Sequence, residues 1–226
     1  MLDKLLGPRP SVQGAVLVLG LGRFGVSCAV RLQQLGMDVL AVDADLDLVN
    51  RYVDTLEHVV RLDSTDSDAL RQLGLDNIAI AIVGMAHLES SIITVLTLKE
   101  QGVPEVWAKA SSRKHGEILR RIGADHIIYP ERDAGERVAH TVAGHMIDYF
   151  EFEDGFAMAR THAPSLAWNR TLAESGIRTR HDVTVVGLKR PGEDFIYAVP
   201  ETRVLEGDEL IVSGTKRNVE RFARLS

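Results

Sequence analysis

The feature that most constrains this 226-residue chain is a glycine-rich turn near its amino end. An apolar run at residues 15–19 predicts a buried strand, and Gly20, Gly22 and Gly25 follow it with the spacing G-x-G-x-x-G. A helical pattern then continues to Leu35. A strand, a glycine turn and a helix in this order are typical of a dinucleotide-binding unit. Its three glycines permit the tight turn, the close approach of a phosphate and the close packing of the helix on the strand.

Two charged residues beside this turn favour a nucleotide site. The second apolar run, Val39 to Val42, ends at Asp43, where an acid can accept hydrogen bonds from a ribose hydroxyl; the alternative is an acid that caps a helix or a loop. Arg23 falls in the first turn of the helix, where the helix dipole disfavours a cation. A pyrophosphate or a longer phosphate chain would offset this cost, whereas an arginine that folds back to solvent would need no anion.

Residues 14–149 alternate apolar runs with helical patterns, which predicts a Rossmann-like doubly wound parallel sheet with strand order 3-2-1-4-5-6. Strands are expected at residues 15–19, 39–42, 58–61, 78–83, 106–110 and 127–129. Ligands of such sheets bind at the carboxyl ends of the strands. Asp63 and Ser64 lie at such an end, although capping of the next helix explains them equally well. The candidate nucleotide-binding residues are Gly20, Gly22, Arg23, Phe24, Gly25, Asp43, Asp45, Asp63, Ser64, Gly84 and Lys109.

The pattern changes near residue 150, which predicts three parts in the chain. Residues 1–13 form an amino-terminal tail with two prolines, residues 14–150 form the nucleotide-binding domain, and residues 151–226 form a small α+β domain. In the first domain, a long helix is expected from Pro130 to about Phe150. In the second, strands are expected at residues 156–160, 183–188, 195–198 and 209–212, and helices at 166–175 and 216–225.

Composition excludes several classes of protein. The net charge of −6 and the pI near 5.8 give no electrostatic footprint for nucleic acid. No stretch approaches the ~18 continuous apolar residues of a membrane-spanning helix, and the charged, proline-broken amino end does not resemble a signal peptide. The single cysteine, Cys28, excludes an internal disulfide and fits a reducing cytosol.

The sequence lacks recognisable catalytic motifs, which favours a sensor over an enzyme. A dehydrogenase needs a proton donor or acceptor beside its nicotinamide, and the chain has no Tyr-x-x-x-Lys pair and no P-loop motif. Glu136 and His140 are four residues apart and could share a metal, although an exposed helix face explains them better. A small NAD-dependent oxidoreductase is the alternative. A redox-sensing transcription factor is a third interpretation, which the absence of a basic patch disfavours.

Five segments together resemble the RCK proteins, regulators of potassium conductance, and among them the cytosolic gating subunits of bacterial Ktr and Trk potassium transporters. The resemblance covers residues 14–226 and leaves out the amino-terminal tail. The segments are Gly20-Leu-Gly-Arg-Phe-Gly25, Val39-Leu-Ala-Val-Asp43, Val106-Trp-Ala-Lys109, Ile122-Gly-Ala-Asp-His-Ile-Ile128 and Tyr129-Pro-Glu-Arg-Asp133.

This resemblance implies a cytoplasmic regulatory subunit at the membrane. Eight lobes would form a ring beneath a membrane-embedded potassium-translocating subunit, and ATP and ADP would compete for the cleft, with NAD(H) binding in some members. Arg23 would contact the terminal phosphate of a nucleotide. Glu131 would help to hold a divalent cation or sodium at a subunit interface, where two symmetry-related carboxylates make a plausible site.

Two further expectations concern the later part of the chain, of which the first comes from the resemblance. Some relatives bind cyclic di-AMP across a dimer of carboxyl-terminal lobes, where Arg178 is a candidate phosphate contact and, equally, an ordinary surface arginine. The long helix after Glu131 carries Val138, Val142 and Ile147, more apolar positions than a small connector needs to bury. We therefore expect this helix to cross to a neighbouring subunit, with packing on its own sheet as the alternative.

Overall fold

The computed structural model describes residues 14–85, 87–144, 146–152 and 154–225, so the tail expected at residues 1–13 lies outside the described residues. The chain divides into two compact units, one that ends at Glu131 and one that begins at Arg132. No helix in the described part of the chain is long and apolar enough to cross a membrane.

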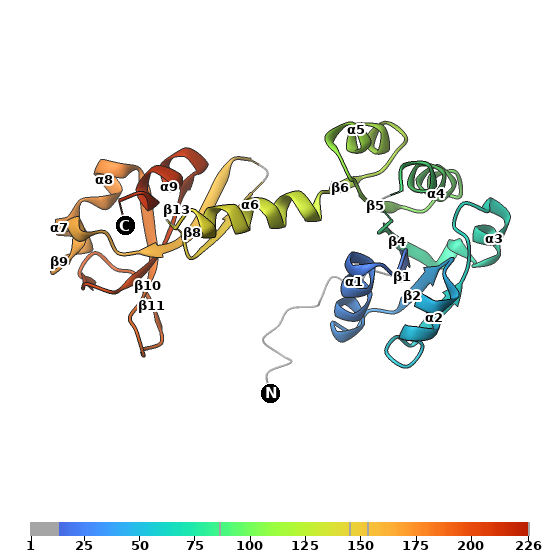
Figure 1. The fold of residues 1–226 in the computed structure, drawn as a ribbon, viewed down its shortest axis with the longest axis horizontal. Helices are drawn as coiled ribbons and strands as arrows, with labels where there is room; N and C mark the ends of the chain where they lie inside the picture. The colour runs from blue at the N-terminus through green and yellow to red at the C-terminus, as the bar shows by residue number, and fades with distance from the viewer. Residues whose placement is uncertain (1–13, 86, 145, 153, 226) are drawn as a thin grey trace. The chain divides into compact units, whose positions relative to one another are not determined.

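The first unit is built on a six-stranded parallel sheet with the order β3-β2-β1-β4-β5-β6 (Figure 1). This order confirms the predicted doubly wound fold. The two strands farthest along the chain, β5 and β6, each begin and end one residue earlier than expected. The strands are β1 (Ala15–Leu19), β2 (Val39–Asp43), β3 (His58–Arg61), β4 (Ile78–Val83), β5 (Glu105–Lys109) and β6 (His126–Ile128).

Helices cover both faces of this sheet, as the apolar strands require. Alternate residues of β1 enter different cores. Val16 and Val18 pack with α1 and α2, whereas Leu17 and Leu19 pack with α3, α4 and α5. A short 3₁₀ turn at Leu75–Asn77 leads into β4. The helices are α1 (Arg23–Gln34), α2 (Leu46–Tyr52), α3 (Ser67–Gln72), α4 (Leu88–Glu100) and α5 (Arg113–Arg121).

Helix α6 (Pro130–Val142) is shorter than the helix predicted to reach about Phe150. Its chain continues to Gly144, which adopts a left-handed φ of 78°, a conformation that ends helices. An additional strand, β7 (Asp148–Glu151), follows. The expectation that Ile147 belongs to the helix was therefore wrong, because Ile147 leads into β7 and its N–H donates to the carbonyl of Arg160.

The second unit contains a five-stranded antiparallel sheet with the order β11-β10-β13-β8-β7, as expected for a small α+β lobe. Its strands are β8 (Phe156–His162), β10 (Val183–Lys189), β11 (Phe195–Tyr197) and β13 (Glu209–Thr215), together with β7. Helix α9 (Lys216–Ala223) buries Val219 and Phe222 in the same core as Leu210 and Val212.

The helix predicted at residues 166–175 was wrong, because this segment is broken into three short elements. A 3₁₀ turn (Ser165–Ala167) is followed by Asn169 with a positive φ of 58°, which interrupts a helix. Strand β9 (Arg170–Thr171) then pairs with β12 (Arg203–Val204). A capping box between Thr171 and Glu174 starts α7 (Leu172–Ser175), and α8 (Ile177–His181) follows it.

Candidate nucleotide-binding site

The glycine turn brings three backbone segments closer together than any side chain would permit. Gly20 has a left-handed φ of 93°. A Cβ atom on Gly25 would lie 1.8 Å from the carbonyl oxygen of Gly20, and one on Gly84 would lie 3.2 Å from the same oxygen. The first helix, the end of β1 and the end of β4 therefore meet at backbone contact, which is the packing role predicted for the third glycine.

Gly22 is the exception, because a Cβ atom there would have no neighbour within 4 Å. Its φ of −63° is open to any residue, so the fold itself does not require a glycine. Gly22 precedes α1, and no side chain caps the first N–H groups of this helix. Arg23 is exposed and Phe24 half-buried in its first turn. The uncapped helix end and the open space at Gly22 leave room for an anion.

Asp43 holds the glycine turn in place. Its carboxylate accepts a hydrogen bond from the N–H of Leu21 at 2.6 Å and another from the N–H of Asp45 at 2.9 Å. Asp45 in turn caps α2 by accepting from the N–H of Asp47. The contact of Asp43 with a ribose stays a prediction, but its carboxylate lies at the predicted tip of β2 and already contacts the turn that would hold the phosphates.

The two residues after β3 make local contacts. Asp63 accepts hydrogen bonds from the N–H and the hydroxyl of Thr65, which lower the pKa of its carboxyl. Ser64 is buried, and its hydroxyl accepts a hydrogen bond from Thr94 at 2.9 Å. Neither residue caps α3, because Asp66 does so. The capping alternative considered for Asp63 and Ser64 was therefore wrong.

A cavity of about 180 Å³ opens at this edge of the sheet and contains four of the predicted residues, Gly20, Asp43, Asp63 and Ser64. The other predicted residues do not line it. Sequence reasoning missed the rest of the lining, which is Val42, Ala44, Leu62, Thr65, Met85, His87 and Ser90. Met85 and His87 follow β4, the strand next to β1, and this adjacency is the one signal that could have indicated them.

A more open hollow lies at the opposite edge of the same sheet. Gly14, Asp38, Asn77 and Glu105, at the amino ends of the strands, are part of its lining. Parallel sheets of this kind bind ligands at their carboxyl ends, so the smaller cavity beside the glycine turn is the better candidate site.

Lys109 and Glu131 form an ion pair at the end of β5. The Lys109 ammonium group lies 2.5 Å from the Glu131 carboxylate, and the hydrogen bond from Lys109 is the main cause that lowers the pKa of Glu131. The charge of Arg23 lowers it further. The described residues contain no group of three or more His, Cys, Asp or Glu side chains arranged for a metal. Glu131 therefore fits a cation site only with ligands from elsewhere.

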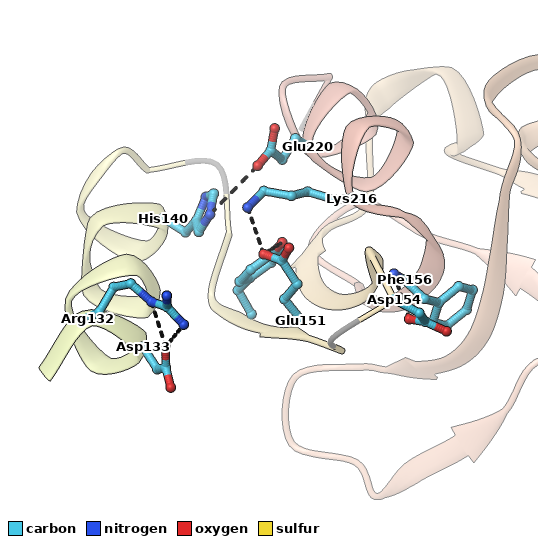
Figure 2. Close-up of polar contacts among 9 residues, drawn as sticks. Arg132, Asp133, His140, Glu151, Asp154, Phe156, Lys216 and Glu220 are labelled. Carbon is cyan, nitrogen blue, oxygen red and sulfur yellow. Dashed lines mark hydrogen bonds and ion pairs between the residues drawn. The ribbon is translucent and has the colours of Figure 1, made fainter. Parts of the chain in front are cut away.

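Helix α6 buries none of its residues, and polar and aromatic contacts hold it to the rest of the second unit. Arg137 forms a bidentate salt bridge with Asp148 of β7, in which its Nε and Nη2 atoms lie 2.8 and 3.0 Å from the two carboxylate oxygens. His140 lies 3.8 Å from Glu220 of α9 (Figure 2) and packs against the ring of Tyr149. Since His140 faces Glu220, the structure offers an explanation of this histidine other than a metal shared with Glu136.

A buried histidine, His115, joins two helices of the first unit. The Nδ1 atom of His115 accepts from the N–H of Ser111, so its Nε2 atom carries the proton and donates to the Ser91 hydroxyl at 2.8 Å. Ser91 donates in turn to the carbonyl of Leu88. Burial lowers the pKa of His115. The contact is structural, and it joins α4 to α5.

Residues 16–130 match the TrkA-N domain family and residues 157–226 match the TrkA-C domain family. The chain is 39% identical over 210 residues to the Ktr system potassium uptake protein C of Bacillus subtilis (strain 168), and this alignment covers 92% of the chain and 95% of the relative. The chain belongs to the Ktr family of potassium uptake proteins. The resemblance that the sequence segments suggested is thereby confirmed.

Solved structures show the same fold for this Ktr family member. The GsuK RCK domain superposes with a TM-score of 0.66 at 19% identity, and the match covers 99% of the chain and 51% of that structure's chain. The GsuK channel bound to NAD gives a TM-score of 0.65 at 20% identity, with 96% and 40% covered. The RCK fold therefore extends across both units of this chain.

Proposed function

We propose that this chain is a nucleotide-sensing regulatory subunit of a potassium transporter, which binds ATP and ADP at the carboxyl edge of its parallel sheet. Its task would be binding rather than turnover, because a gating subunit needs a ligand that shifts a conformational equilibrium. NAD(H) is the other candidate ligand, since a channel of similar fold has been solved with NAD.

The uncapped amino end of α1 is the observation that carries this proposal. Helices α2, α3 and α5 begin with a side chain that caps their free N–H groups, whereas neither α1 nor α4 has a side-chain cap. Helix α1 follows Gly22 and carries the cation Arg23 in its first turn. Phosphate oxygens would satisfy these N–H groups and pair with the guanidinium group. Asp43, which contacts the same turn, would accept from the ribose hydroxyls.

The proposal extends to the assembly and its location. A membrane-embedded potassium-translocating subunit would be the partner, because relatives are potassium uptake proteins, and the chain would act on the cytoplasmic side of the membrane. We expect an octameric ring of identical chains. A ring with repeated interfaces can convert a small change in each cleft into one concerted change of shape.

Two further ligands belong to the proposal. Glu131 from two neighbouring chains could hold a divalent cation or sodium at their interface. Cyclic di-AMP could bind a dimer of second units near Arg178, which is exposed on α8.

Thermal unfolding with a panel of ligands tests the proposal. A ligand that binds the folded chain raises its unfolding temperature by mass action. We expect ATP and ADP to raise it, and we include NAD, NADH and cyclic di-AMP in the same panel. No shift with any adenine nucleotide would contradict the proposal. Turnover of nicotinamide cofactors with common alcohols, aldehydes or hydroxy acids would favour the oxidoreductase alternative instead.

A further inference from the structure

Helix α6 meets the rest of the second unit through a cluster of side chains around His140 (Figure 2). The His140 ring packs on the ring of the buried Tyr149, with 4.2 Å between the ring centroids. Its Nε2 atom lies 3.8 Å from the Glu220 carboxylate of α9. The chain passes from the first unit to the second inside the first turn of α6. The cluster therefore holds the carboxyl-terminal half of the helix that connects the two units.

Negative charge is in excess around this histidine. Glu151 of β7 accepts hydrogen bonds from the Tyr149 hydroxyl at 3.0 Å and from the Lys216 ammonium group at 2.7 Å. The hydrogen bond to Glu151 is the main cause that raises the pKa of Lys216. The charges of Glu136, on α6, and of Glu220, on α9, raise it further. Three carboxylates, one from each of the three packed elements, thus share one ammonium group, and a second positive charge among them would be stabilised.

His140 is the side chain that can supply this charge on demand. Arg137, the neighbouring cation of α6, is already bound to Asp148. Histidine side chains gain or lose their charge between pH 5 and pH 8. A protonated His140 attracts Glu220 and offsets the repulsion between Glu136 and the carboxylates of β7 and α9, whereas a neutral His140 keeps only its ring contact.

We propose that His140 is a pH-sensitive switch, which holds the carboxyl-terminal half of α6 against α9 and β7 when it is protonated and loosens it when it is neutral. His140 acts as a positioning residue for the helix and contacts no ligand in this role. Because the docked helix favours the charged imidazole, docking strengthens as the pH falls from 8 towards 6 and weakens as the pH rises through the same window. The inference concerns the connection between the units and goes beyond the proposed nucleotide binding.

Amide hydrogen exchange of the full-length protein, measured by mass spectrometry on peptides that cover α6, tests the switch. Exchange times at pH 6.0 and pH 8.0 are scaled for the chemical pH dependence of exchange, so that the comparison reports the opening of the helix. We expect the α6 amides to be roughly two- to five-fold better protected at pH 6.0, the effect of one partly exposed ion pair. Peptides from β13, the central strand of the sheet, serve as the reference for opening of the whole unit.

Two variants and one control complete the test. His140→Gln stays neutral at every pH, so its α6 amides gain no protection at pH 6.0, and Glu220→Gln removes the facing carboxylate and reduces the gain. The matched control is His162→Gln, the same substitution at an exposed residue of β8 in the same unit, which keeps the full gain. Equal protection of α6 at the two pH values in the unmodified protein, or a gain that persists in His140→Gln, would overturn the inference. If His140→Gln fails to fold, an undiminished gain in Glu220→Gln would overturn it.

Discussion

The glycine turn and helix α6 are held in opposite ways. At the turn, Gly20, Gly25 and Gly84 meet at backbone contact, and the carboxylate of Asp43 fastens the loop to β2. Along α6 no residue is buried, and the contacts are ion pairs and one aromatic contact. Close-packed interiors transmit strain, whereas exposed ion pairs contribute little stability and exchange partners readily. The comparison predicts that substitutions in the glycine turn cost more stability than substitutions along α6.

The largest loss of stability should come from adding a side chain within the glycine turn. Gly25→Ala places a methyl group 1.8 Å from the Gly20 carbonyl oxygen, so α1 must move away from β1. We expect a loss of about 2–4 kcal/mol in the free energy of unfolding, measured by denaturant titration. Gly22→Ala is the control, because its methyl group meets no protein atom within 4 Å. Equal losses in the two variants would show that packing does not rigidify the turn.

Removal of the Asp43 carboxylate should have the next largest effect. Asp43→Ala deprives the ribose of its acceptor and the Leu21 N–H of its partner, so adenine-nucleotide affinity should fall by roughly 1.5–3 kcal/mol, measured by calorimetry. Asp43→Asn is the conservative control, because its carbonyl oxygen can still accept from Leu21. Unchanged affinity in Asp43→Ala would assign this residue a purely structural role.

The contact between α4 and α5 should make the stability of the first unit depend on pH through His115. Burial lowers the pKa of His115 in the folded state, and the unfolded side chain titrates near 6.5. Below that pH the unfolded chain binds a proton that the folded chain resists. The free energy of unfolding therefore decreases as the pH is lowered through this window. His115→Gln should show a shallower fall between pH 7.5 and pH 5 in denaturant titrations. Identical slopes would contradict a neutral, buried His115.

The smallest effect on stability should come from α6. Val142 is 80% exposed, so Val142→Asp should change the free energy of unfolding by less than about 0.5 kcal/mol. If the helix crosses to a neighbouring chain, the same substitution should lower the mass of the multimer in light scattering, and Val142→Thr, of similar shape, should not. A multimer unaffected by Val142→Asp would remove α6 from the interface.

The first unit could be predicted closely from the sequence because its signals are local. Apolar runs and glycines placed its six strands to within one residue. The end of α6 could not be predicted, because helical spacing of apolar residues continues from Val138 to Ile147 although Gly144 and β7 interrupt it. At the site, the sequence placed Asp43 correctly at the end of β2. The pairing of Lys109 with Glu131 joins residues 22 positions apart, which no periodicity reveals.

Small-angle X-ray scattering of the purified multimer with ATP and with ADP tests the central claim most directly. If the chain senses nucleotides as proposed, light scattering should give a multimer, expected to be an octamer, and the two nucleotides should produce different scattering profiles. Two nucleotide-free samples of the same protein should give identical scattering profiles. A stable monomer, or a multimer whose profile is the same with ATP and with ADP, would contradict the account.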